Sequence, residues 1–102
     1  MTARLEPDAQ GGFRLQGELS FDTVPALLEQ SARLFAGVSE LRISLDGVNR
    51  SDSAGVALLT EWVRLARRRG QSVRLLALPK QMRDIVRVCG LESVLPFESA
   101  AN

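Results

Sequence analysis

The chain has 102 residues, of which 45% are hydrophobic and 25% charged, and its formal net charge is +1. This length and composition predict one soluble globular domain over residues 1–102, with an ordered core at about residues 3–97. A net charge near zero argues against a nucleic-acid partner, and the absence of histidine excludes a Ser-His-Asp triad and any histidine-containing metal site.

The first predicted elements form a hairpin. Ala3 to Glu6 reads as a short edge strand, and Gly11-Gly12 as the turn that follows it. Phe13 to Leu19 alternates apolar and polar residues, which is typical of a half-buried strand.

A helix is predicted next. Asp22 or Thr23 can cap it, and Pro25 lies early enough that its missing N–H costs nothing. Gly37 ends it. The apolar positions recur at helical spacing: Val24, Leu27, Leu28, Ala32 and Phe35.

A second strand-helix unit occupies the middle of the chain. Glu40 to Leu45 alternates as a strand, and Asn49 to Gly55 reads as a polar loop that leads into a long helix ending at Gly70. Trp62 belongs to the widened apolar stripe of this helix, so we expect it to pack in the core rather than anchor a partner. The stripe comprises Val56, Leu58, Leu59, Trp62, Val63, Leu65 and Ala66.

The last third contains a strand at Ser72 to Leu78 and a helix that Pro79 opens and Gly90 closes. The apolar positions of that helix are Met82, Ile85, Val86 and Cys89. The lone Cys89 cannot form an internal disulfide, and we expect it to be a buried thiol. Val94, Leu95 and Phe97 could add a final strand. Helix-linked strands after an opening hairpin predict an α/β domain with a mixed sheet of four to five strands.

The segment between the middle strand and the long helix is the most informative for function. Loops at the carboxyl end of an α/β sheet are where such folds present ligands and partners. Asp52 and Ser53 lie there, and either could serve only as the helix cap. Ser53 is also a candidate phospho-acceptor, since a phosphate would add about two negative charges at this point.

Beyond this loop, one side of the long helix is expected to lie opposite the core. It carries small residues first and polar residues later, which suits close approach of another protein. The predicted partner-binding residues are Ser53, Ala54, Ala57, Thr60, Glu61 and Arg64.

The run Asp52-Ser53-Ala54-Gly55-Val56, after a strand and at the start of a helix, resembles the Asp-Ser/Thr-x-Gly-Leu/Val signature of STAS domains. The resemblance in element order covers about Leu5 to Phe97. It implies a mixed sheet with helices largely on one face, and a protein that binds partners without catalysis or cofactors.

Two branches of that family are open. The helix sequence up to Trp62 and the Arg-rich Leu65 to Gly70 look more like the STAS subunit of the Mla phospholipid transporter. That resemblance implies binding to the ATPase of an ABC transporter, with its permease, at the inner membrane. The alternative is an anti-sigma-factor antagonist, in which Ser53 would be phosphorylated by a partner that is both kinase and anti-sigma factor.

Charge suggests a third class. Residues 61–90 carry a local charge of +6, against −3 before and −2 after them, and could bind anionic lipid or nucleotide or form a solvated helix surface. Because Arg67, Arg68 and Arg69 are expected to wrap around a helix, this class ranks last. No stretch is long and apolar enough to insert into a membrane, and residues 1–8 lack a signal-peptide core, so we expect a cytoplasmic protein that reaches the membrane only through its partner.

Overall fold

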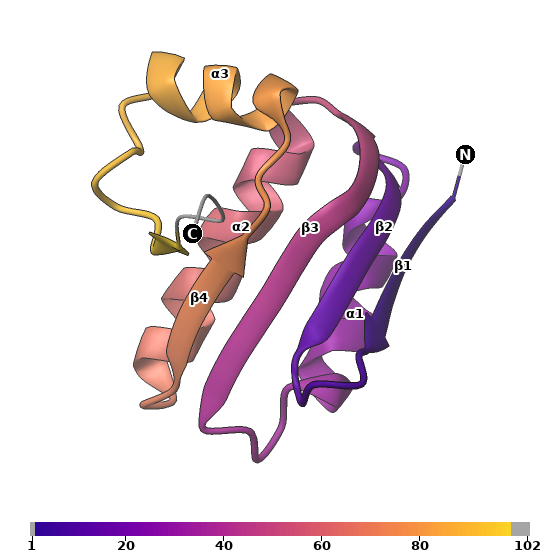
Figure 1. Cartoon of the computed structure of the whole chain (residues 1–102), viewed down its shortest axis with the longest axis vertical. Coiled ribbons are helices and arrows are strands. Elements are labelled where there is room, and N and C mark those ends of the chain that lie inside the picture. The colour runs from indigo at the N-terminus through magenta and orange to yellow at the C-terminus, as the bar shows by residue number, and fades with distance from the viewer. Residues whose placement is uncertain (1, 99–102) are drawn as a thin grey trace.

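The computed structural model describes residues 2–98 of the chain (Figure 1). Residues 99–102, which follow the predicted ordered core, lie outside the described residues. Strands and helices follow one another in the order β-β-α-β-α-β-α-β. Their bounds are β1 Ala3–Pro7, β2 Phe13–Leu19, α1 Val24–Leu34, β3 Glu40–Ser51, α2 Ser53–Arg68, β4 Ser72–Leu76, α3 Lys80–Val88 and β5 Phe97–Glu98.

The five strands form one mixed sheet in the order β1-β2-β3-β4-β5. β1 is antiparallel to β2, whereas every later neighbouring pair is parallel. In Figure 1, α1 and α2 lie behind the sheet and α3 crosses its upper end, which leaves the front of the sheet without a helix. The predicted α/β class, mixed sheet and one-sided helices are therefore confirmed.

The opening hairpin is closed by one carboxylate. Asp8 Oδ1 accepts hydrogen bonds from the backbone N–H groups of Gln10 and Gly12, each at 2.8 Å. Gly11 adopts φ +84°, a conformation that side-chain-bearing residues rarely take. The turn was therefore predicted at the right place, and Asp8 is the residue that organises it.

The core between the sheet and the helices contains a chain of aromatic contacts. Phe13 and Phe35 lie edge to face at 4.9 Å between ring centroids, and Phe35 and Trp62 do so at 5.4 Å. Trp62 is 2% exposed, and its indole N–H donates to Ser31 Oγ at 2.8 Å. This satisfied donor explains how a tryptophan can be fully buried, and it confirms that Trp62 is a core residue.

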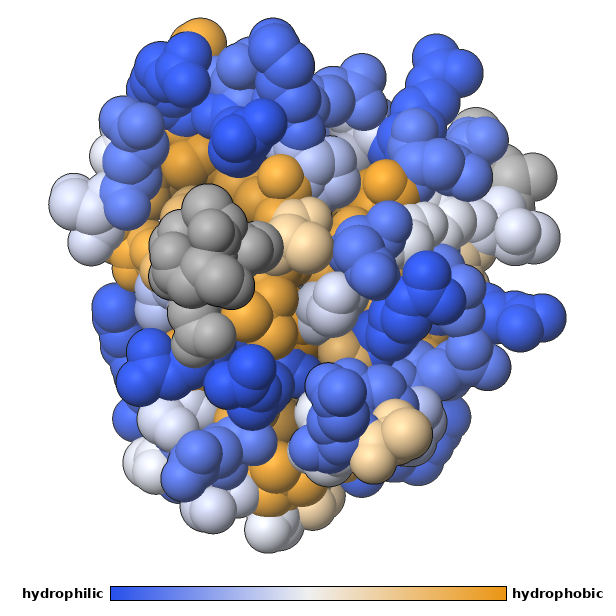
Figure 2. All heavy atoms as spheres, in the orientation of Figure 1, coloured by the Kyte–Doolittle hydropathy of each residue, from blue (hydrophilic) through white to orange (hydrophobic). Residues whose placement is uncertain are grey.

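The front of the sheet carries polar side chains that interact across strands. Arg14 on β2 contacts Asp46 on β3 at 2.9 Å, and Gln16 donates to Glu6 on β1 at 2.6 Å. The Arg14 guanidinium lowers the pKa of Asp46, chiefly through the hydrogen bond between these two side chains. Figure 2 shows this face as hydrophilic over β1 and β2, with hydrophobic residues between β4 and the segment after α3.

The middle strand is longer than its sequence pattern predicts. β3 extends to Ser51, so residues 49–51 are strand and only Asp52 separates β3 from α2. The extension follows from pairing with β2, in which Gly17 lies opposite Val48 and Leu19 opposite Ser51, with register shifts along the pair. Polar residues obscured this part of the strand in the sequence because one side of it is solvent-exposed.

The prediction of a buried Cys89 is also wrong. α3 ends at Val88, and Cys89 is its exposed C-cap. Met82 and Val86 form the buried side of this helix, and the turn at Gly90, with φ +70°, leads the chain away before Cys89 can join them.

At the start of α1, Thr23 occupies the N-cap position, but its side chain does not cap the helix. Its hydroxyl instead accepts from the Ser20 N–H at 2.9 Å and donates to the Glu18 carbonyl at 2.8 Å, which ties the β2–α1 turn together. Across residues 2–98, no helix has the length and apolar character needed to cross a membrane.

Candidate functional site

The β3–α2 junction lies at the carboxyl end of two adjacent parallel strands. Leu19 ends β2 opposite Ser51, the last residue of β3, and the Asp52 N–H donates to the Leu19 carbonyl at 3.2 Å. The turn that follows β2 and the N-terminus of α2 therefore start from neighbouring points of the same sheet edge. This edge is where a parallel α/β sheet presents its binding groups.

Asp52 is the N-cap of α2. Its Oδ1 accepts from the Ala54 N–H at 2.8 Å, and its carbonyl accepts from the Gly55 N–H at 3.1 Å. Its extended backbone, with φ −106° and ψ −164°, is the usual conformation of a residue that caps a helix. The cap fixes the direction in which the first residue of α2, Ser53, leaves the sheet.

Beneath the cap, Ser51 is 3% exposed, and both its N–H and its hydroxyl donate hydrogen bonds. Its N–H donates to Gln81 Oε1 of α3 at 2.9 Å, and its hydroxyl donates to the Asp52 carbonyl at 3.0 Å. A Cβ at Gly55 would overlap Ser51 Oγ and lie 3.0 Å from the Leu19 side chain. The close approach of α2 to the strand ends therefore requires glycine at position 55.

Ser53 is exposed, and no group of residues 2–98 forms a hydrogen bond with its hydroxyl. The N-terminus of a helix favours negative charge, but the Asp52 carboxylate already occupies it. A phosphate on Ser53 would therefore stand beside a like charge and project away from the domain.

One exposed side of α2 carries most of the predicted partner-binding residues. Ala57 and Arg64 are exposed, whereas Thr60 and Glu61 are half-buried. With Ser53 they recur at helical spacing, and we call this set the α2 stripe: Ser53, Ala57, Thr60, Glu61 and Arg64.

Ala54 does not belong to the stripe. It is 4% exposed, on the side of α2 that also carries Leu58, and this contradicts its predicted place opposite the core. The boundary between the two sides of α2 therefore falls one residue earlier than predicted: residues 54 and 58 lie on the core side, whereas residues 53 and 57 lie on the outer side.

The polar end of the α2 stripe is an ion pair. Arg64 donates to both carboxylate oxygens of Glu61, at 3.0 and 2.6 Å. This hydrogen bonding lowers the pKa of Glu61 and raises that of Arg64. Thr60 is turned inward, with its hydroxyl donating to the Val56 carbonyl at 3.0 Å. The stripe therefore offers a partner one free hydroxyl, a bare methyl and a preformed ion pair.

Two further residues at this end of the sheet, Phe21 and Gln81, were not predicted as site residues from the sequence. Phe21 lies in the turn after β2 and is 77% exposed, so its ring is accessible to another molecule. Its position directly after a strand, between Ser20 and Asp22, was the only signal in the sequence. Gln81 gave no signal, because only the tertiary fold brings α3 to the end of β3.

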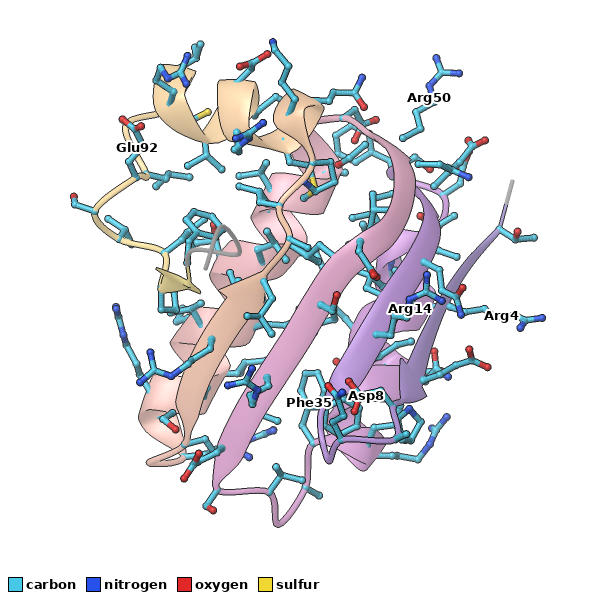
Figure 3. All side chains as sticks on the ribbon, viewed as in Figure 1. Arg4, Asp8, Arg14, Phe35, Arg50 and Glu92 are labelled. Atoms are coloured by element: carbon cyan, nitrogen blue, oxygen red, sulfur yellow. The ribbon has the colours of Figure 1, made fainter. Side chains whose placement is uncertain are left out.

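A shallow cavity of about 280 Å³ opens between the β2 turn and α3. It is lined by Glu18, Leu19, Ser20, Arg50, Ser51, Asp52 and Gln81. Figure 3 shows the labelled Arg50 extending away from the domain at this end. Within residues 2–98, no group of three or more histidine, cysteine, aspartate or glutamate side chains could hold a metal ion.

A family model described as "Mlab, STAS domain" matches residues 3–96. Among solved structures, the chain is similar to the anti-sigma factor antagonist SpoIIAA in its unphosphorylated form, with a TM-score of 0.72 and 20% identity over 98% of this chain and 89% of that one. An anti-sigma factor antagonist from Mycobacterium paratuberculosis gives a TM-score of 0.70 and 21% identity, over 93% of this chain and 82% of the other. These likenesses establish a shared fold. No curated protein matches the chain.

Proposed function

The chain belongs to the STAS domain family, of the Mlab type, and from this membership we propose that it is a non-catalytic subunit that binds and supports the ATPase of an ABC-type phospholipid transporter. The family acts through contacts between proteins. The transporter would contribute to outer-membrane lipid asymmetry. The subunit would lie in the cytoplasm and reach the inner membrane through the ATPase and its permease.

The observation that best supports this proposal is the α2 stripe itself. Its first two residues, Ser53 and Ala57, are exposed and small, so the backbone of another protein can approach α2 closely. Asp52 and the buried Ser51 hold this end of the helix to the sheet. A surface that is already ordered loses little conformational entropy when it binds.

In the proposed complex, the ATPase packs on the α2 stripe, and Phe21 on the neighbouring turn supplies an aromatic contact. Aromatic residues are enriched among those that contribute most to binding at interfaces. A bulky anion at position 53 would separate the surfaces and bring unpaired negative charge into the contact.

The experiment is a pull-down from native membranes with the wild-type chain, Ser53→Glu and Ser39→Glu. Ser39 is exposed and directly precedes β3, whereas Ser53 lies beyond the other end of that strand. We expect wild type and Ser39→Glu to recover an ATPase together with its permease, and Ser53→Glu to lose both. Equal recovery by Ser53→Glu would refute the proposed surface, and failure of all three to recover an ATPase would refute the proposed partner.

The alternative function is an anti-sigma-factor antagonist regulated by phosphorylation of Ser53. The free, exposed Ser53 hydroxyl favours it, because a kinase needs an accessible acceptor. The partner would then be a serine kinase that is also an anti-sigma factor. Incubation with such a kinase should add one phosphate to the wild-type chain and none to Ser53→Ala, and the same pull-down should recover the kinase instead of an ATPase.

A further inference from the structure

Three arginines lie along one side of the C-terminal half of α2. Arg64, Arg67 and Arg68 have i, i+3 and i+4 spacing and line the same groove. Arg69 lines a different cavity, together with Gly70 and Gln71. The sequence predicts that residues 67–69 wrap around the helix. In the structure, Arg69 lies apart from Arg67 and Arg68, which share a groove with Arg64.

The floor of this groove is apolar. It runs between α2 and the segment that follows α3, has a volume of about 360 Å³, and is lined by Val63, Val94 and Leu95 between the arginines, with Thr60 at its edge. Val94 is 41% exposed although it is a large apolar residue. Arg67 Nη2 donates to the Val94 carbonyl at 3.3 Å, so the two walls of the groove are joined.

The charge of the groove is positive. Of the residues that line it, only the three arginines are ionisable. Glu61, on the adjoining surface of α2, pairs with Arg64, and the positive charge of Arg68 also contributes to lowering its pKa. Among the side chains that the structure describes, Glu61 is the one carboxylate that pairs with these arginines, which leaves a net positive rim beside an apolar floor.

We propose that this groove binds an amphipathic anion: one apolar chain packed on Val63, Val94 and Leu95, with a carboxylate or phosphate headgroup at the arginines. Burying apolar surface stabilises such a complex, and guanidinium groups bind carboxylate and phosphate through paired, charge-assisted hydrogen bonds. The groove volume lies within the range of small-molecule sites. No aromatic side chain of the described residues lines the groove, so a nucleobase would find no aromatic ring there to stack on.

This site goes beyond the proposed ATPase contact and does not depend on it. The two surfaces share Thr60 and Arg64, so a bound anion would also cover one end of the α2 stripe. Occupancy would then oppose partner binding at that end. The purified chain alone suffices to test the site, and the result is separate from the pull-down.

The test is a calorimetric titration of the full chain with decanoate and with decyl phosphate, each below its micelle concentration, and with 1-decanol and inorganic phosphate as probes of the tail and head alone. We expect saturable binding of both anionic amphiphiles at one per chain, and at least about tenfold weaker binding of either separate part. Raising the salt concentration should weaken binding, because the arginines are exposed.

Two variants locate the site. Arg68→Gln should weaken decanoate binding about fivefold, whereas Arg69→Gln, which removes the same charge one residue away, should leave it within about twofold. Amide NMR signals of residues 63, 94 and 95 should shift with decanoate.

Four results would overturn the proposal: no saturable binding, equal binding of 1-decanol, equal effects of the two arginine variants, or binding to anionic phosphatidylglycerol vesicles without binding of decanoate. The first three remove the site or its selectivity for an anion. The last would mean that the arginines recognise a membrane surface rather than a single amphiphile in the groove.

Discussion

The sixteen residues of α2 form two sides with different roles: an inner side that packs in the core and an outer side that faces solvent. The inner side, with Gly55, Leu59 and Trp62, is almost wholly excluded from solvent and packs against the sheet and α1. Among the described residues, no buried side-chain nitrogen or oxygen lacks a hydrogen-bond partner. The outer side, with Ser53 and Ala57, contacts nothing in the described structure that would fix the choice of those residues. Substitutions on the inner side should therefore change stability, and those on the outer side should change binding.

The largest effect on stability is expected for Trp62→Ala. It removes the ring that packs on Phe35 and the indole N–H that donates to Ser31 Oγ. The free energy of unfolding should fall by about 3–5 kcal/mol. This change in the free energy of unfolding can be measured by urea denaturation, with far-UV circular dichroism as the signal. Ala57→Ser, on the outer side of the same helix, is the control and should change the value by less than about 0.5 kcal/mol. A similar loss of stability in both variants would contradict the different roles of the two sides.

Gly55→Ala tests the contact between α2 and the strand ends. Helix propensity alone would favour alanine by about 1 kcal/mol, but the added methyl group meets Ser51 Oγ and Leu19. We expect a net loss of about 1–3 kcal/mol in the free energy of unfolding. The double variant Ser51→Ala, Gly55→Ala should lose less than the sum of the single variants, because it removes one side of the overlap. An increase in stability for Gly55→Ala would show that α2 has room to move.

Asp52→Ala tests the N-cap of α2, the end of the helix where the inner and outer sides begin. Loss of the hydrogen bond to the Ala54 N–H should cost about 1 kcal/mol in thermal or urea denaturation. It should also weaken partner binding, because Ser53 would no longer be held in one direction. Asp22→Ala, at the same sheet edge but without a capping bond from its side chain, should do neither. If Asp52→Ala kept full stability, the cap would not be what holds this junction.

The smallest effect is expected at the Glu61–Arg64 pair on the outer side. Because Arg64 lowers the folded-state pKa of Glu61, the pair stabilises the fold above the ordinary glutamate pKa, and this contribution is lost as pH falls through the lowered value. Arg64 is exposed and Glu61 only half-buried, so solvent screens the pair and the gain in stability is slight. NMR titration of the Glu61 carboxyl should show its pKa rise toward the ordinary value in Arg64→Gln. An unchanged pKa would mean that the pair does not persist in solution.

Several features of the site could be predicted from sequence because they depend on neighbouring residues. The Asp52 cap and the exposed positions of Ser53, Ala57 and Arg64 follow from helical spacing once the helix is recognised. Ala54 was assigned to the wrong side, because its small side chain gives no hydropathy signal that distinguishes a buried from an exposed position.

The sequence by itself determined the order of strands and helices, the opening hairpin and the burial of Trp62, since apolar periodicity and glycine positions are local signals. Only the tertiary structure decided what distant segments do together. Pairing with β2 carries β3 on to Ser51, Gln81 reaches that strand end from α3, and Val94 completes the groove of Arg64, Arg67 and Arg68. Such contacts join residues 27 or more positions apart, and no local pattern of hydrophobicity or charge encodes which of them will meet.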